Sequence, residues 1–152
     1  MGKLYKFQSL EKEKLAWLAG IFQAEAYFYL DERVRSVSND PNYTPPSPVP
    51  SIRLEMIEKD LMEHVGDCLD QSVKKQVRQT SAGNHVYRIS LASRPKVKAF
   101  LTEISPFVVG HLKRSKIQEL LYVCEQYDQW VELGGRSKAA SLSARMKAQK
   151  SK

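Results

Sequence analysis

Alternation between apolar and polar side chains is the feature that most limits how this chain can fold. In residues 51–57, Ile52, Leu54 and Met56 alternate with Arg53 and Glu55. Because successive side chains of a strand point to opposite faces of a sheet, this pattern predicts a strand with one apolar and one charged face. Residues 26–38, 73–80 and 85–91 are predicted to be strands as well, and the last two form a hairpin around the turn at 81–84.

Helices are predicted between these strands. Apolar residues recur at helical spacing at 10–22, 59–69, 94–104 and 112–130, and the first of these helices would begin behind a cap at Ser9. Residues 39–50 contain five prolines and are expected to form a connecting loop. This order predicts an α+β domain at residues 1–135, with helices on one face of a four-stranded antiparallel sheet. Residues 136–152 would form a basic tail, either a helix on a partner or a disordered arm.

The charge of the chain is concentrated at one end. The 152 residues have a formal net charge of +7, which suggests an anionic partner. Residues 136–152 carry six basic side chains and no acid. Because the rest of the chain is nearly neutral, a nucleic-acid-binding surface must come from the arrangement of charges within the fold.

The face of the sheet turned away from the helices is predicted to collect polar side chains. Taken at alternate positions, they are Asp31, Arg33, Arg35, Arg53, Glu55, Lys74, Gln76, Arg78 and Arg88. Six of these nine are basic, whereas acids gather on the helix predicted at 59–69 and just after it, at Asp60, Glu63, Asp67 and Asp70. Such a face is either an ordinary solvated surface or a DNA-binding surface, because arginine can bond guanine, glutamine can bond adenine and acids can accept from cytosine.

Little in the sequence points to export, to a disulfide or to a zinc site. No apolar run is long enough to cross a bilayer, and charge interrupts the N-terminal segment before a signal peptide could form. We therefore expect an intracellular protein, of a bacterial or phage-host cytoplasm or of an organelle. Cys68 and Cys124 are far apart and are expected to be buried thiols, and His64, His85 and His111 lack the spacing of metal ligands.

Nine residues at 18–26, LAGIFQAEA, join the end of the first predicted helix to the start of the first strand. They resemble the signature of the LAGLIDADG homing endonucleases. The order of elements and the chain length are similar to those of single-motif members of that family, so the resemblance covers roughly residues 8–130. It implies an αββαββα core whose four-stranded sheet forms a saddle on double-stranded DNA. One motif per chain implies a homodimer.

Small residues in and before the motif give a physical reason for dimerisation. Ala16, Ala19, Gly20 and Ala24 would let two helix backbones approach closely. The same residues also suit ordinary helix packing within one chain. The resemblance implies a dimer interface formed by Ala16, Ala19, Gly20, Phe22 and Gln23.

The resemblance also implies catalytic residues. Glu25 occupies the eighth motif position, which in the family holds the metal-binding acid, and the implied metal is Mg²⁺. Two such carboxylates in a dimer would repel each other without divalent cations. Lys113, with Lys116 as second choice, resembles a lysine near the cleavage centre that polarises water or offsets phosphate charge, and Glu58 resembles a polar residue of the surrounding solvent network. The alternatives are a surface acid, a solvated lysine and a first-turn helix acid.

Three residues depart from the family pattern. Gln23 replaces the usual first acid, Ala26 replaces the usual glycine and Phe22 is larger than the common aliphatic residue. Glycine at the helix–strand junction would turn the backbone without steric cost. With alanine there, either the turn keeps a negative φ or the junction is strained.

The resemblance as a whole implies a site-specific, Mg²⁺-dependent endonuclease that cuts double-stranded DNA at long, pseudo-palindromic targets as a homodimer. The loop at 39–50 and the hairpin tip near Gly83 would reach the outer base pairs. Two alternatives stay open. One is a non-cleaving protein on the same fold, either a DNA-binding regulator or an intron RNA maturase, and the other is an interaction module whose basic face meets an acidic protein.

Overall fold

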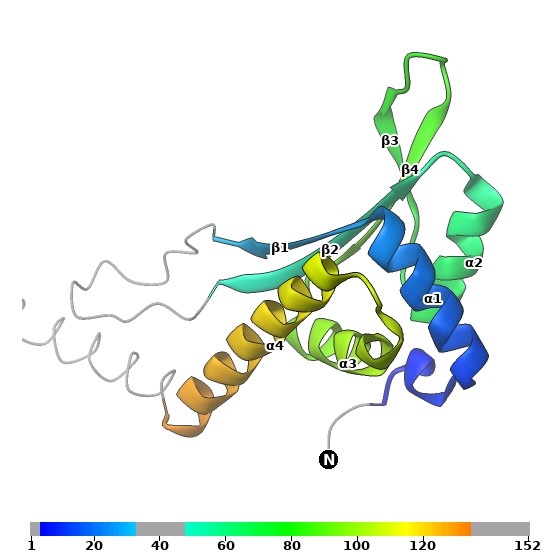
Figure 1. Ribbon diagram of the computed structural model, residues 1–152. Helices are drawn as coiled ribbons and strands as arrows, with labels where there is room; N and C mark the ends of the chain where they lie inside the picture. The colour runs from blue at the N-terminus through cyan, green and yellow to red at the C-terminus, as the bar shows by residue number, and fades with distance from the viewer. Residues whose placement is uncertain (1–3, 33–47, 135–152) are drawn as a thin grey trace, which may run out of the picture.

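A single antiparallel sheet forms one layer of the protein. The computed structural model describes residues 4–32 and 48–134 (Figure 1). The sheet has four strands in the order β1-β2-β4-β3. Their bounds are β1 Ala26–Asp31, β2 Val49–Met56, β3 Lys74–Gln79 and β4 His85–Leu91.

The helices form the second layer. They are η1 Lys6–Ser9, α1 Lys12–Glu25, α2 Lys59–Leu69, α3 Arg94–Ile104, η2 Ser105–Phe107 and α4 His111–Glu132. Figure 1 shows α1, α3 and α4 on the same side of the sheet, and the β3–β4 hairpin extending away from it. The predicted α+β architecture with an antiparallel sheet is thus confirmed. None of the helices in the described part of the chain is long and apolar enough to span a membrane.

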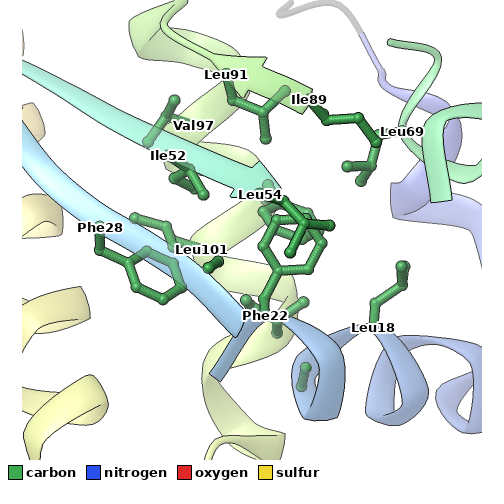
Figure 2. Packing of buried hydrophobic residues seen from close by; sticks show 14 of the residues in the cluster. Leu18, Phe22, Phe28, Ile52, Leu54, Leu69, Ile89, Leu91, Val97 and Leu101 are labelled. Carbon is green, nitrogen blue, oxygen red and sulfur yellow. The ribbon is translucent and has the colours of Figure 1, made fainter. Parts of the chain in front are cut away.

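Alternation along the strands divides the sheet into two faces, as predicted. Ile52 and Leu54 of β2 are buried, and so are Ile89 and Leu91, their partners in β4. Figure 2 shows these side chains packed over α1 and α3, with Phe22 and Leu101 directly opposite. The intervening residues of β2 and β4 therefore point away from the helices.

The first helix begins later than predicted. Ser9 does not cap it, because Ser9 ends the short η1 turn and its hydroxyl donates to the carbonyl of Lys6. α1 starts at Lys12 and continues to Glu25, so that almost the whole motif is helical. Ala26 then adopts φ −84° and ψ 153°, which is ordinary extended backbone. The junction is unstrained, and the absence of glycine there has no steric cost.

The proline-rich loop ends earlier than predicted, since Pro50 belongs to β2 and pairs with Leu30 of β1. The strand tolerates proline there because the pairing of β2 with β4 starts only at Ile52, so Pro50 has a strand neighbour on one side. Residues 39–47 of the predicted loop and the basic tail at 136–152 lie outside the described residues.

The hairpin turn matches its sequence pattern. The amide of Thr80 donates to the carbonyl of Asn84, and Gly83 has a φ of +83°, a conformation that favours glycine. The β3–β4 register shifts between Lys75 and Gln79. Val77, within this irregular stretch, is fully exposed, whereas Val86 on the facing strand β4 is buried.

Candidate functional site

The motif helix ends at the surface with an acid. Glu25 is the last residue of α1, and its side chain is exposed. The next residue, Ala26, is the first of β1 and pairs with Leu54 of β2. The carboxylate of Glu25 therefore lies where α1 meets the sheet, accessible to an external ligand.

Lys113 lies at the same junction. It belongs to the first turn of α4, and its Nζ donates to the carbonyl oxygen of Ala26 at 2.7 Å. The ammonium also lies 5.2 Å from the centroid of the Phe28 ring. Lys116, the second choice from the sequence, instead pairs with Glu119 at 3.2 Å. Of the two lysines, Lys113 is the one that the fold anchors beside Glu25.

Gln23 holds the loop before α4 against the end of α1. Its Oε1 accepts hydrogen bonds from the backbone amides of Val109 at 3.0 Å and Gly110 at 3.2 Å. Gly110 is the residue that precedes α4, so this bond sets where the helix carrying Lys113 begins. A neutral amide oxygen is sufficient for this task, which explains how the chain accommodates glutamine at a motif position that usually holds an acid.

Two residues of the predicted dimer interface lie in the core of the chain. Ala19 and Phe22 are fully buried within the chain, and the Phe22 ring packs edge-on against Phe100 at 4.8 Å. They share a stripe with Leu15 and Leu18, which turns toward the core because residues three and four apart lie on the same face of a helix. Neither side chain is available to a second copy.

The opposite face of α1 carries the small residues. Ala16 and Gly20 are partly exposed and Ala24 is exposed, each four residues from the next. A Cβ atom added at Gly20 would meet no atom within 4 Å. This face, which we call the small-residue face, is where a second helix can approach closely.

Glu58 follows the end of β2 that pairs with the start of β1, at the residue that precedes α2. Its backbone carbonyl accepts from the amide of Met62 at 3.1 Å, but its side chain does not cap the helix. The carboxylate is exposed. Within the described residues Lys113 makes no ion pair with Glu25 or Glu58, so each carboxylate keeps its oxygens available.

The sheet face opposite the helices carries most of the residues predicted for it. Register places Arg53 and Glu55 of β2 beside Ser90 and Arg88 of β4, and Arg88 beside Lys74 of β3. Arg33 and Arg35 lie outside the described residues. We call this surface the outer face; its predicted residues within the structure are Asp31, Arg53, Glu55, Lys74, Gln76, Arg78 and Arg88.

Glu55 binds two arginines on the outer face. Its Oε1 accepts a hydrogen bond from Nε of Arg88 at 2.9 Å and lies 2.7 Å from Nη2 of the same arginine, and its Oε2 accepts from Nη2 of Arg78. Burial alone would raise the pKa of the Glu55 carboxyl, but the hydrogen bonds and charges of Arg88 and Arg78 outweigh burial and lower this pKa below its ordinary value. Glu55 is therefore ionised at neutral pH.

Two tyrosines on the outer face were missed by the sequence reasoning. Tyr27 lies opposite Arg53 in the register of β1 and β2, and its ring stacks on that of Tyr29 at 5.1 Å. The guanidinium of Arg53 lies 5.4 Å from the Tyr29 ring, and its Nε has no hydrogen-bond partner among the described residues. The sequence could have predicted this position, because Tyr27 and Tyr29 alternate with buried Phe28 and therefore share a face of the strand with Asp31.

No metal cluster exists within the described chain. No group of three or more His, Cys, Asp and Glu side chains is placed there to hold an ion. Mg²⁺, however, is commonly bound through one or two carboxylates together with water and phosphate oxygens. The donor set that a single chain offers, one exposed carboxylate on a helix end, fits that kind of shared site.

Sequence comparisons find no relative of this chain, whereas structural comparisons find many. No family model matches the chain, and no curated protein matches it. Its structure is similar to that of the archaeal intron-encoded homing endonuclease I-Vdi141I solved with DNA, with a TM-score of 0.61 and 12% identity over 91% of this chain and 85% of that one.

Two further solved structures show the same similarity. For the homing endonuclease I-CvuI in complex with its target, the TM-score is 0.56 at 17% identity, covering 88% of this chain and 80% of the other. For the LAGLIDADG homing endonuclease I-LtrWI bound to target DNA, the TM-score is 0.55 at 16% identity, covering 94% of this chain but 45% of the other. The chain thus has the fold of the LAGLIDADG homing endonucleases.

Proposed function

We propose that this protein is a Mg²⁺-dependent endonuclease that cuts double-stranded DNA at long, pseudo-palindromic sites as a homodimer. The observation that supports it best is the exposed Glu25 carboxylate at the junction of α1 and β1, where Lys113 binds the backbone carbonyl of the next residue, Ala26. This junction adjoins the outer face, which is polar and uncovered by the described helices.

Dimerisation would use the small-residue face of α1. Packing two copies through Ala16, Gly20 and Ala24 about a two-fold axis brings the C-terminal ends of both helices to the same place. Each end carries a Glu25 carboxylate. Like charges at short range repel, so the pair would remain ionised only with cations between or beside them.

A bound Mg²⁺ would activate water and stabilise the leaving oxygen of a phosphodiester. Glu25 would hold it, together with phosphate oxygens of the DNA. I-CvuI, which shares the fold, was solved with its target in the presence of calcium, so a divalent ion is compatible with such a complex. Lys113 would donate to a phosphate oxygen, since the Ala26 carbonyl occupies only one of its three N–H donors.

DNA would lie along the outer face. The two stacked tyrosines lie on β1 with Arg53 beside them on β2, and Arg78 and Arg88 lie on the two hairpin strands, β3 and β4. A hairpin tip at Gly83 that extends beyond the sheet would reach the outer base pairs. Both I-Vdi141I and I-LtrWI were solved on DNA.

Selection of cleaved sites tests the proposal. A library of randomised duplexes is incubated with the protein and Mg²⁺, and the cut molecules are sequenced. We expect symmetric sites to be enriched and Glu25→Gln to bind them without cutting. Glu63→Gln, which makes the same change on exposed α2, is the matched control and should cut normally.

The other functions are outcomes of the same experiment. A protein that binds particular duplexes tightly but nicks none of them would be a non-cleaving regulator. Preference for structured RNA over every duplex would indicate a maturase. Binding to DNA with no sequence preference, together with a monomer in sedimentation, would favour the interaction module.

A further inference from the structure

Arg78 and Arg88 are not free cations on the outer face. Both are bound by the same carboxylate, Glu55, although the three residues come from three different strands. Arg88 places two nitrogens within 3 Å of Glu55 Oε1 and its side chain is 29% exposed, whereas Arg78 places one nitrogen on Oε2 and is 61% exposed. Glu55 itself is 18% exposed, so the arginines shield it from water.

This arrangement has a cost for contacts with DNA phosphates. To reach a phosphate, either arginine would have to give up its ion pair with Glu55. The carboxylate would then be left facing the phosphates without a partner, and like charges repel. By contrast, each guanidinium has five N–H donors, so both arginines can reach base edges while they remain paired.

We propose that Glu55 is a specificity-determining residue, which acts by withholding Arg78 and Arg88 from the phosphates of arbitrary DNA while keeping them in place for base edges. The inference rests on the proposed function, because it requires that the outer face binds DNA. Glu55 is a positioning residue in this account: it acts through the two arginines. Glu55 would thereby weaken non-specific binding to DNA. Non-specific sites compete with every specific site for the protein.

The test measures binding to a duplex of arbitrary sequence, about 30 base pairs long, by fluorescence anisotropy over a range of NaCl concentrations. Each added phosphate contact makes the slope of log K against log salt more negative by about 0.9. Glu55→Gln frees both arginines, so we expect the slope to become more negative by about 1 to 2 and the affinity in 0.1 M salt to rise at least about fivefold.

Glu63→Gln is the control for the change in net charge. It changes the net charge by the same amount as Glu55→Gln, but Glu63 lies on α2, where its partner is Lys59. It should leave the slope within about 0.5 of the parent value. Replacing both arginines, with Arg78→Gln and Arg88→Gln in one chain, should also change the parent slope little, because Glu55 already occupies them. In that background Glu55→Gln should have no further effect, as expected when one residue acts through the others.

Three results would overturn the inference. One is equal slopes for the parent and Glu55→Gln, and another is an increase in Glu63→Gln as large as in Glu55→Gln. The third is a loss of about 2 in the slope when the arginines are removed from the parent, which would show that they contact phosphates despite Glu55. This last variant decides the matter even if Glu55→Gln does not fold. If neither the parent nor any variant binds duplex DNA at low salt, the proposed function fails together with the inference.

Discussion

At the scale of single residues, the backbone beside Glu25 is held from two sides. Gln23 binds the two amides that precede α4, and Lys113 of α4 binds the carbonyl of Ala26. Glu25 lies between Gln23 and Ala26 in the chain. Two long-range contacts thus fix the backbone that carries this carboxylate, as the role proposed for Glu25 beside a phosphate requires.

The bond of Gln23 predicts a difference between two substitutions. Gln23→Ala removes the acceptor for both amides and should lower the free energy of unfolding by about 1 kcal/mol. Gln23→Glu keeps an oxygen in the same place and should cost less. Urea unfolding followed by circular dichroism measures both. Equal losses in the two variants would contradict a role for the acceptor oxygen.

Glu55 predicts a dependence of stability on pH. Its pKa in the folded protein is lowered from an ordinary value of 4.5, so its contribution to stability is complete above 4.5 and is lost as the pH falls through the folded-state value. Glu55→Gln has no such contribution to lose. Between neutral pH and about pH 3, urea unfolding should therefore show a smaller loss of stability in the variant than in the parent. Glu63→Gln should lose as much as the parent.

The sequence was informative about single residues only where local pattern decides their position. Glu25 was predicted at the helix–strand junction because both elements are visible in the sequence. The partners of Gln23 are 86 and 87 residues away along the chain, and no local pattern reports such a distance. The pairing of Glu55 with two arginines likewise needs the register of three strands.

At the scale of elements, α1 serves two surfaces at once. Its core face, with Leu18 and Phe22, is fully buried, while Gly20 on the other side is open. The spacing of residues in the sequence separates these two faces, since Ala19 lies at helical spacing from Leu15, Leu18 and Phe22. Small size alone could not reveal it, because small residues occur on both faces of the helix.

Gly20 provides a test at this scale. Gly20→Leu should leave the chain folded, because the added side chain points into open space and leucine favours helix by up to about 1 kcal/mol over glycine. Two such helices could no longer approach closely, so the variant should sediment as a monomer and lose cleavage. Gly20→Ala, as control, should remain a dimer. A Gly20→Leu variant that sediments like the parent would contradict the assigned interface.

At the scale of the whole molecule, one cluster of apolar side chains joins every layer. It includes Phe7 of η1, Met62 of α2, Ile89 of β4 and Leu120 of α4. The α+β class and the strand order along the chain could be predicted, because the alternation of strands and the periodicity of helices are local properties. Which strands are neighbours in the sheet depends on the whole chain, and this spatial order came from the structure.

Cys124 reports on the packing of α4. Both cysteines are buried and unpaired, as predicted, and burial raises the pKa of the Cys124 thiol. The thiol should therefore react slowly with iodoacetamide in the folded protein and rapidly in urea, in step with the loss of circular dichroism. Mass spectrometry of the alkylated protein measures the rate. Rapid labelling of Cys124 under native conditions would show that the region around α4 opens on its own.

The two-faced character of the strands has an evolutionary consequence. Ile52 and Leu54 stabilise the core, while the neighbouring Arg53 points to the other side. Substitution at one set of positions need not disturb the other, so the outer face can change while the fold is preserved. Under the proposed function, such a chain can therefore come to bind a different DNA sequence while the side chains that hold the core stay the same.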